Sequence, residues 1–144
     1  MQDVTTLPAL TLSTAQILIE GAAILAFAAS GLLEAARKKL DIVGVCMVVG
    51  LAAFGGGTLR DLLLDRRPFF WVEHSYWLWT LLGLSLLAML FVRNHHFEPT
   101  ERAIQWPDAI GLGLFTAGGT QIALAANMPP IVAVLMGMIT AVFG

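Results

Sequence analysis

The chain has 144 residues, of which 58% are hydrophobic and only 12% are charged, and its mean hydropathy is +0.80. A soluble domain carries about 25% charged residues, so the composition argues against an ordinary soluble protein and predicts a membrane protein. The formal net charge is −2 with no basic face, so we expect no nucleic-acid partner. The single cysteine, Cys46, excludes an intrachain disulfide.

Five apolar segments follow one another along the chain. They cover approximately residues 13–36, 42–64, 76–92, 109–126 and 131–144. A membrane-spanning helix needs about 20 residues, with a range of about 17–25, so the first four segments are long enough and the fifth is short. We therefore predict an all-α polytopic membrane protein, with residues 1–144 forming a single membrane domain, and we expect the natural protein to continue beyond Gly144.

The second segment contains the most informative pattern of the chain. Three consecutive glycines interrupt an apolar run, and a charged pair follows them; the residues concerned are Gly55, Gly56, Gly57, Thr58, Arg60 and Asp61. Glycine costs about 1 kcal/mol relative to alanine in a helix interior, so three together predict a break or kink. Irregular backbone at membrane depth is tolerated only where protein buries it or water wets it. The pattern therefore predicts a polar site or a pore within a helix bundle.

Each of these residues has an alternative interpretation. Arg60 lines or gates a pore, because charges at membrane depth are costly and functional, or it snorkels to the outer interface. Asp61 is its partner, or a cap on the helix that follows. The glycines mark a functional kink, or they allow another helix to pack closely. Glu20, about two turns into the first helix, faces a water-filled lumen or the outer headgroups.

The fourth segment contains small residues at helical spacing. Gly113 with Ala117, and Gly119 with Ala123, fit the pattern of helices that pack closely in membranes. We expect helix contacts at both pairs, either within one subunit or between subunits.

The charged loops predict the orientation in the membrane. Arg37, Lys38 and Lys39 follow the first segment, and further basic residues follow the third. The positive-inside rule places these loops in the cytoplasm and the amino terminus outside, although Arg66 and Arg67 argue weakly against it. Arg37–Lys39 are topology determinants in this interpretation, with anionic lipid binding as the alternative. Four aromatic residues, Trp71, Tyr76, Trp77 and Trp79, are expected to form a belt at the outer face.

The sequence contains no pattern that is typical of a metal site or of a catalytic site. His95 and His96 are adjacent and so do not share a helix face, and no Cys or acidic residue lies at ligand spacing from them. The chain has no convergent Ser-His-Asp set and no phosphate-binding loop. We therefore expect no metal, no cofactor and no enzymatic activity.

The chain also repeats itself at an offset of 88 residues. The sequence FAASG at 27–31 aligns with FTAGG at 115–119, and AFGG at 53–56 aligns with AVFG at 141–144. The repeat unit would hold three helices, with residues 13–92 as the first unit and residues 106–144 as part of the second. A unit with an odd number of spans inverts its neighbour, which predicts an inverted-topology repeat.

Several strings resemble the prokaryotic trimeric intracellular cation (TRIC) channels, a family also labelled as a glycine-transporter-like domain. They are RKKLD at 37–41, GGGTLRDLL at 55–63 and PFFW at 68–71, followed in the second repeat by DAIGLGLF at 108–115 and GMITAV at 137–142. The resemblance implies seven helices, built as two inverted three-helix repeats and a last helix, of which five apolar segments are present here. It further implies a homotrimer in which each subunit has its own pore for monovalent cations, chiefly potassium.

The resemblance also implies residue roles. The pore is lined by the kinked second and fifth helices, which assigns a first kink to Gly55–Asp61 and a second to Thr140 and Gly144. Phe143 departs from the pattern, because a glycine is more usual there, and the chain ends where a second Gly-Gly-x-x-Arg-Asp would be completed. Three functions remain open: a channel for potassium and sodium, a secondary transporter of a small solute such as glycine, and a non-conducting membrane scaffold.

Overall fold

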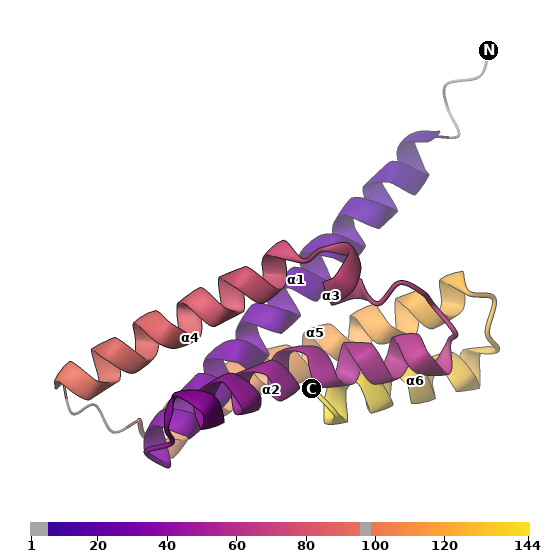
Figure 1. Cartoon of the computed structure of the whole chain (residues 1–144). Coiled ribbons are helices and arrows are strands. Elements are labelled where there is room, and N and C mark those ends of the chain that lie inside the picture. Colours follow the sequence, from indigo (N-terminus) through magenta and orange to yellow (C-terminus); the bar gives the residue numbers. More distant parts are fainter. Residues whose placement is uncertain (1–5, 96–98) are drawn as a thin grey trace.

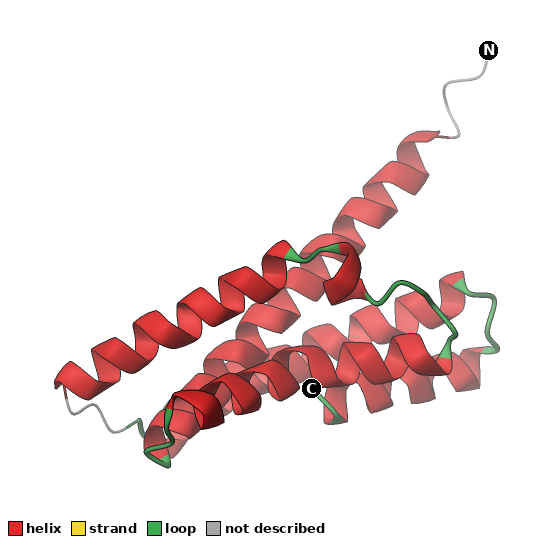
Figure 2. Ribbon diagram, viewed as in Figure 1, coloured by secondary structure: helices red, strands yellow, loops and turns green. Residues whose placement is uncertain are grey.

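The computed structural model describes residues 6–95 and 99–144, and every regular element in these ranges is a helix (Figure 2). The helices are α1 (Thr6–Arg37), α2 (Ile42–Leu63), α3 (Phe70–Glu73), α4 (Tyr76–His95), α5 (Glu101–Ala125) and α6 (Pro130–Val142). The prediction of an all-α chain is therefore confirmed, and five of the six helices correspond to the five apolar segments.

The helix bounds differ from the predicted ones mainly at two N-termini. Helix α1 begins at Thr6 and α5 begins at Glu101, several residues before the predicted starts at about residues 13 and 109. At α5, the Thr100 side chain accepts a hydrogen bond from the Ala103 N–H at 3.4 Å and caps the helix. Residues 101–108 include Pro107 and several polar residues, and the apolar pattern therefore placed the start of the segment too late. Helix α3 has only four residues, which is too short for a repeating pattern of apolar residues, so the sequence did not predict it.

The helices pack around α1 and α5. Helix α1 lies against α2 and α5, α5 and α6 form an antiparallel pair, α2 contacts α6, and α4 lies more loosely against α2 and α1 (Figure 1). The N-terminal part of α1 projects beyond the other helices. The core consists largely of small side chains, including Ala23, Ala28, Ala53 and Ala123, with Phe27 and Phe115 between them. Small residues let helix backbones approach closely, as in membrane bundles.

The outer surface is strongly apolar. Large hydrophobic side chains are exposed along α2, α4 and α6, among them Leu51, Leu87 and Ile131. Among the described residues, Thr14–Arg37 and Ile42–Leu63 are long and apolar enough to cross a membrane, while Tyr76–Phe91 and Pro130–Val142 are shorter apolar helices. An exposed apolar surface of this extent suits contact with lipid or with other membrane helices.

The three glycines of α2 do not interrupt the helix. Helix α2 continues through Gly55–Gly57 to Leu63, so the predicted interruption is wrong, and a bend of the helix axis stays a prediction. Two of the glycines lie against the end of α6: a Cβ on Gly55 would lie 2.5 Å from the Phe143 carbonyl oxygen, and one on Gly56 would collide with the Thr140 carbonyl oxygen. Close packing, the alternative interpretation, therefore accounts for Gly55 and Gly56.

The inverted repeat of the fold brings equivalent residues together. The rings of Phe27 and Phe115, which are 88 residues apart in the sequence, lie 5.1 Å apart between centroids. Gly55 and Phe143 are separated by the same offset and also lie in contact. The turns after α1 and α5 match too, because Lys39 and Asn127 both have positive φ, of 53° and 58°. These contacts agree with the predicted inverted repeat, whose bounds stay a prediction.

Replacing Gly56 by alanine tests this close approach. Gly56→Ala should destabilise the protein by about 1–3 kcal/mol, because the new methyl group forces α2 away from the α6 backbone. Gly50→Ala is the matched control, since nothing lies within 4 Å of a Cβ there, and it should be neutral or stabilising by up to about 1 kcal/mol. Thermal unfolding in detergent measures both, and equal melting temperatures for the two variants would contradict the packing.

Candidate functional site

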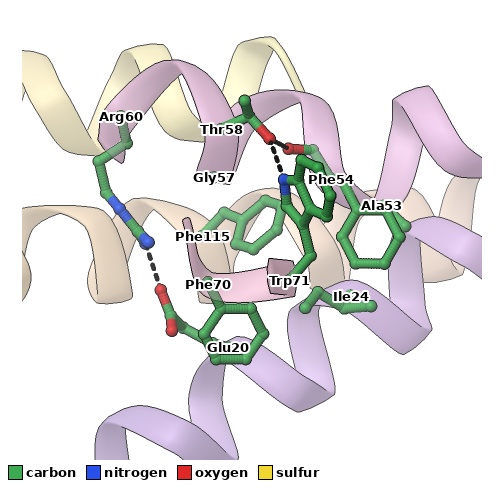
Figure 3. Close-up of a pocket in the computed structure, with 10 residues that line it drawn as sticks. All are labelled: Glu20, Ile24, Ala53, Phe54, Gly57, Thr58, Arg60, Phe70, Trp71 and Phe115. Carbon is green, nitrogen blue, oxygen red and sulfur yellow. Dashed lines mark hydrogen bonds and ion pairs between the residues drawn. The ribbon is translucent and has the colours of Figure 1, made fainter. Parts of the chain in front are cut away.

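A buried arginine lies at the centre of the site. The Arg60 side chain is only 1% exposed, and its Nη1 forms an ion pair with Oε1 of Glu20 on α1, whose side chain is 9% exposed (Figure 3). Ala53, Gly56 and Arg60 are all buried on α2, and their spacing of three and four residues places them on one helix face. Arg60 thus points into the bundle, and the snorkelling alternative does not hold.

Asp61 completes a three-residue ion cluster and links it to α3. Its Oδ1 accepts hydrogen bonds from Arg60 Nε at 2.9 Å and Nη2 at 2.7 Å, and its Oδ2 accepts one from the Phe70 N–H at 3.2 Å. Phe70 is the first residue of α3, so Asp61 is both the partner of Arg60 and the acceptor for the start of the next helix. The cluster therefore joins α1, α2 and α3.

A second hydrogen bond holds α3 against α2. The Thr58 hydroxyl donates to the Phe54 carbonyl oxygen at 2.7 Å and accepts from Trp71 Nε1 at 3.0 Å (Figure 3). The Trp71 indole N–H is therefore directed toward α2, and its place in the expected outer belt stays a prediction. Tyr76 and Trp79 are exposed, as that belt would require.

A small cavity lies beside the ion cluster. Its volume is about 10 Å³, close to the minimum that one water molecule needs. Its polar edge is formed by Glu20, Arg60 and Thr58, and the remaining wall is apolar or aromatic; the lining residues are Glu20, Ile24, Ala53, Phe54, Gly57, Thr58, Arg60, Phe70, Trp71 and Phe115 (Figure 3). Gly57 leaves this wall open, since nothing lies within 4 Å of a Cβ at that position.

The buried part of the site holds two carboxylates and one guanidinium. Glu20 and Asp61 both pair with Arg60, and the second arginine near them lies farther out. Arg66 Nη1 lies 3.8 Å from Asp61 Oδ1, but its side chain is 50% exposed, so it lies at the mouth of the site. A buried ion needs a partner, because removing it from water costs several kcal/mol. Carboxylates inside a bundle favour cations over anions.

The structure brings together only part of the predicted site. Gly57, Thr58 and Arg60 line the cavity, but the second-repeat residues lie elsewhere. Thr140 is buried between α6 and α2 and donates its hydroxyl to the Met136 carbonyl oxygen at 2.6 Å, and Gly144 lies against the rings of Phe115 and Phe27.

Six lining residues had no predicted role in the site: Ile24, Ala53, Phe54, Phe70, Trp71 and Phe115. Glu20 was left between two settings, a lumen and the headgroups; it is paired with Arg60 inside the bundle and lines the cavity, so the headgroup setting does not hold and the lumen setting stays a prediction. A signal for this pairing was present, because Glu20 and Arg60 are oppositely charged residues within two adjacent apolar segments.

The basic residues after α1 lie at the surface. Arg37 Nη2 forms an ion pair with Glu101 Oε1 at 3.0 Å, and Lys38 Nζ lies 3.6 Å from Glu34 Oε1. The first pair joins the end of α1 to the start of α5. No group of three or more potential metal ligands occurs among the described side chains, and His96, one of the two histidines considered above, falls outside the described residues.

Removing the Thr58 hydroxyl tests how α3 is held. Thr58→Val should cost about 1 kcal/mol and should accelerate amide hydrogen exchange in residues 70–73, because the Trp71 indole loses its acceptor. Thr80→Val is the matched control, since Thr80 donates only to the Tyr76 carbonyl oxygen, at 2.8 Å on the surface. Unchanged exchange at α3 in Thr58→Val would show that this hydrogen bond does not hold the helix.

Comparison with known proteins places the chain in a family. A family model described as "Glycine transporter" matches residues 17–93 and 105–144. A UPF0126 membrane protein of Vibrio cholerae is 38% identical over 118 residues, which cover 79% of this chain and 47% of the relative. A UPF0126 inner membrane protein of Escherichia coli is also 38% identical over 118 residues, covering 82% of this chain and 56% of the relative. The chain thus spans about half the length of these relatives.

Solved structures give the same assignment. The crystal structure of a TRIC trimeric intracellular cation channel orthologue from Rhodobacter sphaeroides has a TM-score of 0.80 and 36% sequence identity, over 90% of this chain and 66% of that one. A second solved structure, described under the words "structural basis for conductance through TRIC cation channels", has a TM-score of 0.71 and 31% identity, over 86% of this chain and 60% of that one. The chain therefore belongs to this prokaryotic membrane-protein family, which is described by the glycine-transporter model and includes the TRIC channels.

Proposed function

We propose that the full-length protein is a membrane channel for monovalent cations, chiefly potassium, and that the Glu20–Arg60–Asp61 cluster lies on its conduction path. The observation that carries this proposal is the arginine that is 1% exposed beside two carboxylates and a cavity. Ionisable residues at membrane depth are costly, and those that occur there commonly mark substrate or ion pathways. The likeness to cation-channel structures points to the same activity.

In this proposal Arg60 acts as the gate. Its guanidinium occupies the polar edge of the cavity, and the remaining volume of about 10 Å³ leaves room for about one water molecule. A hydrated cation therefore cannot pass beside it, and conduction requires Arg60 or α3 to move. Once Arg60 moves aside, Glu20 and Asp61 present negative charge to the path, which selects cations. Gly57 and Thr58 border the same space, while Gly55 and Gly56 hold α2 against α6.

We propose a homotrimer in a prokaryotic cell membrane. Gly113 and Ala117 are exposed on α5, and their spacing suits close packing with a helix of a neighbouring subunit. The large exposed hydrophobic residues would contact membrane lipids or the other subunits. The related Rhodobacter protein is described as trimeric.

We propose that the amino terminus lies outside and that Arg37, Lys38 and Lys39 lie in the cytoplasm. The ion pair between Arg37 and Glu101 supports this, because it places the loops after α1 and before α5 at the same end of the bundle. Positive charge at both loops then falls on one side of the membrane. Exposed Arg37, Lys38 and Lys39 would also meet anionic headgroups there.

A second candidate function is a secondary transporter of a small solute such as glycine. The observation that favours it is the description of the matching family model as a glycine transporter. The same cavity would then serve as the solute site, although its volume of about 10 Å³ is small for any solute.

Flux through liposomes tests the channel proposal. The full-length protein should pass potassium down its gradient, and Arg60→Gln should raise that flux at least about two-fold. Removing a unit positive charge a few Å from the path changes its electrostatic energy by about 1 kcal/mol or more at an effective dielectric constant near 20. Arg37→Gln is the matched control, because its ion pair is exposed, and it should leave the flux unchanged.

The other candidates give different results in the same assay. Saturable counterflow of glycine without electrical current would show that the protein is a transporter and not a channel. If neither potassium flux nor glycine counterflow is found, the protein is a non-conducting scaffold. Potassium flux that Arg60→Gln leaves unchanged, in a variant shown to be folded, would remove Arg60 from the conduction path.

A further inference from the structure

The wall of the cavity beside Arg60 is built by three long helices and one short helix. Glu20 and Ile24 come from α1, Phe115 comes from α5, and α2 supplies most of the other lining residues. The rest of the wall is formed by Phe70 and Trp71, the first two residues of the four-residue helix α3 (Figure 3). Helix α3 thus covers one side of the cavity, and the long helices form the other sides.

Helix α3 is held in place by few interactions. A helix of four residues is too short to be stable by itself, and each residue of α3 is at least partly exposed, Val72 to 47%. Two hydrogen bonds join α3 to α2: the Phe70 N–H donates to Asp61 Oδ2 at 3.2 Å, and Trp71 Nε1 donates to Thr58 Oγ1 at 3.0 Å. Segments with few buried contacts open at a lower free energy than the rest of a fold. We therefore expect α3 to open before the long helices separate.

The two hydrogen bonds differ in what they connect. Asp61 divides its oxygen atoms between two partners, since Oδ1 accepts from Arg60 and Oδ2 accepts from Phe70. Loss of the Phe70 bond therefore leaves the pairing of Arg60 in place. The bond between Trp71 and Thr58 involves no charged group, and it holds the indole ring at the cavity wall. Helix α3 can accordingly leave the cavity while the ion cluster stays paired.

We propose that α3 is a lid over the cavity and that the hydrogen bond between Thr58 and Trp71 is its latch. When this bond breaks, Phe70 and Trp71 move off the wall, and water reaches Glu20 and Arg60. Thr58 and Trp71 are positioning residues in this mechanism, because they set how often the cavity is open to water. The lid itself does not rest on the transport activity proposed above, whereas its effect on ion flux does.

The reactivity of a thiol in the cavity tests the lid. In full-length protein that is solubilised in detergent and carries Cys46→Ser and no other native cysteine, Ala53→Cys places a thiol on the cavity wall, where Ala53 is 1% exposed. Thr58→Val should raise its rate of reaction with a small water-soluble thiol reagent about three-fold or more, because one neutral hydrogen bond of Trp71 is lost. Thr80→Val is the matched control, since Thr80 donates to a backbone carbonyl oxygen at the surface of α4, and it should leave the rate unchanged.

Two further variants separate loss of the latch from a general loosening of the bundle. Thr58→Ser retains the hydroxyl and should retain the original rate. In a Trp71→Phe background the indole donor is already absent, so Thr58→Val should have no further effect. Ile24→Cys, on the α1 side of the cavity, replaces Ala53→Cys as the reporter if that variant does not fold.

Three results would overturn the proposal. They are equal thiol rates in Thr58→Val and its parent, an equal acceleration by Thr80→Val, and an effect of Thr58→Val that persists in full beside Trp71→Phe. Potassium flux through liposomes is measured on the same variants, and Thr58→Val should raise it as well. The expected thiol rates in a protein that passes no potassium would support the lid and contradict the channel, so the two proposals fail separately.

Discussion

A guanidinium that is buried away from water needs an oppositely charged partner, and the buried guanidinium of this chain is that of Arg60. Glu20 reaches it from α1, Asp61 holds it from the same helix, and Asp61 also accepts the Phe70 N–H of α3. Three helices are therefore positioned by one charge. Removing one member of a buried ion pair costs about 3–5 kcal/mol, so these contacts fix the relative positions of α1 and α2 and the shape of the cavity.

Close packing around small residues makes this pairing possible. Gly55 and Gly56 let α2 lie directly on the α6 backbone, and Gly119 and Gly137 do the same between α5 and α6. Residues separated by the 88-residue offset meet between α1 and α5, at Phe27 and Phe115, and between α2 and the end of α6, at Gly55 and Phe143. A bundle built in this way has little space for water, and the cavity beside Arg60 is correspondingly small. If this cavity is the proposed permeation path, conduction requires movement of a charged side chain or of α3.

The sequence predicted the helices from their apolar length, and it predicted Arg60 as a site residue because a charge within an apolar run is costly. It misplaced the start of α5, because the segment was defined by its apolar residues and the first two turns of the helix, residues 101–108, include several charged and polar residues. It missed Trp71 and Phe70, since α3 is one turn long and its position depends on hydrogen bonds to Thr58 and Asp61. The opposite charges of Glu20 and Arg60 in adjacent apolar segments made their pairing possible to suspect, but the contact itself depends on how α1 and α2 pack, which no local pattern encodes.

The coupling between Glu20 and Arg60 tests the central claim most directly. A double-mutant cycle of Glu20→Gln, Arg60→Gln and the double variant, followed by thermal unfolding in detergent, isolates the pairwise energy. We expect each single variant to be strongly destabilised and the double variant to recover part of the loss, with a coupling energy of about 1.5 kcal/mol or more. Additive effects of the two substitutions would contradict the account, because the cluster would then not hold α1 and α2 together.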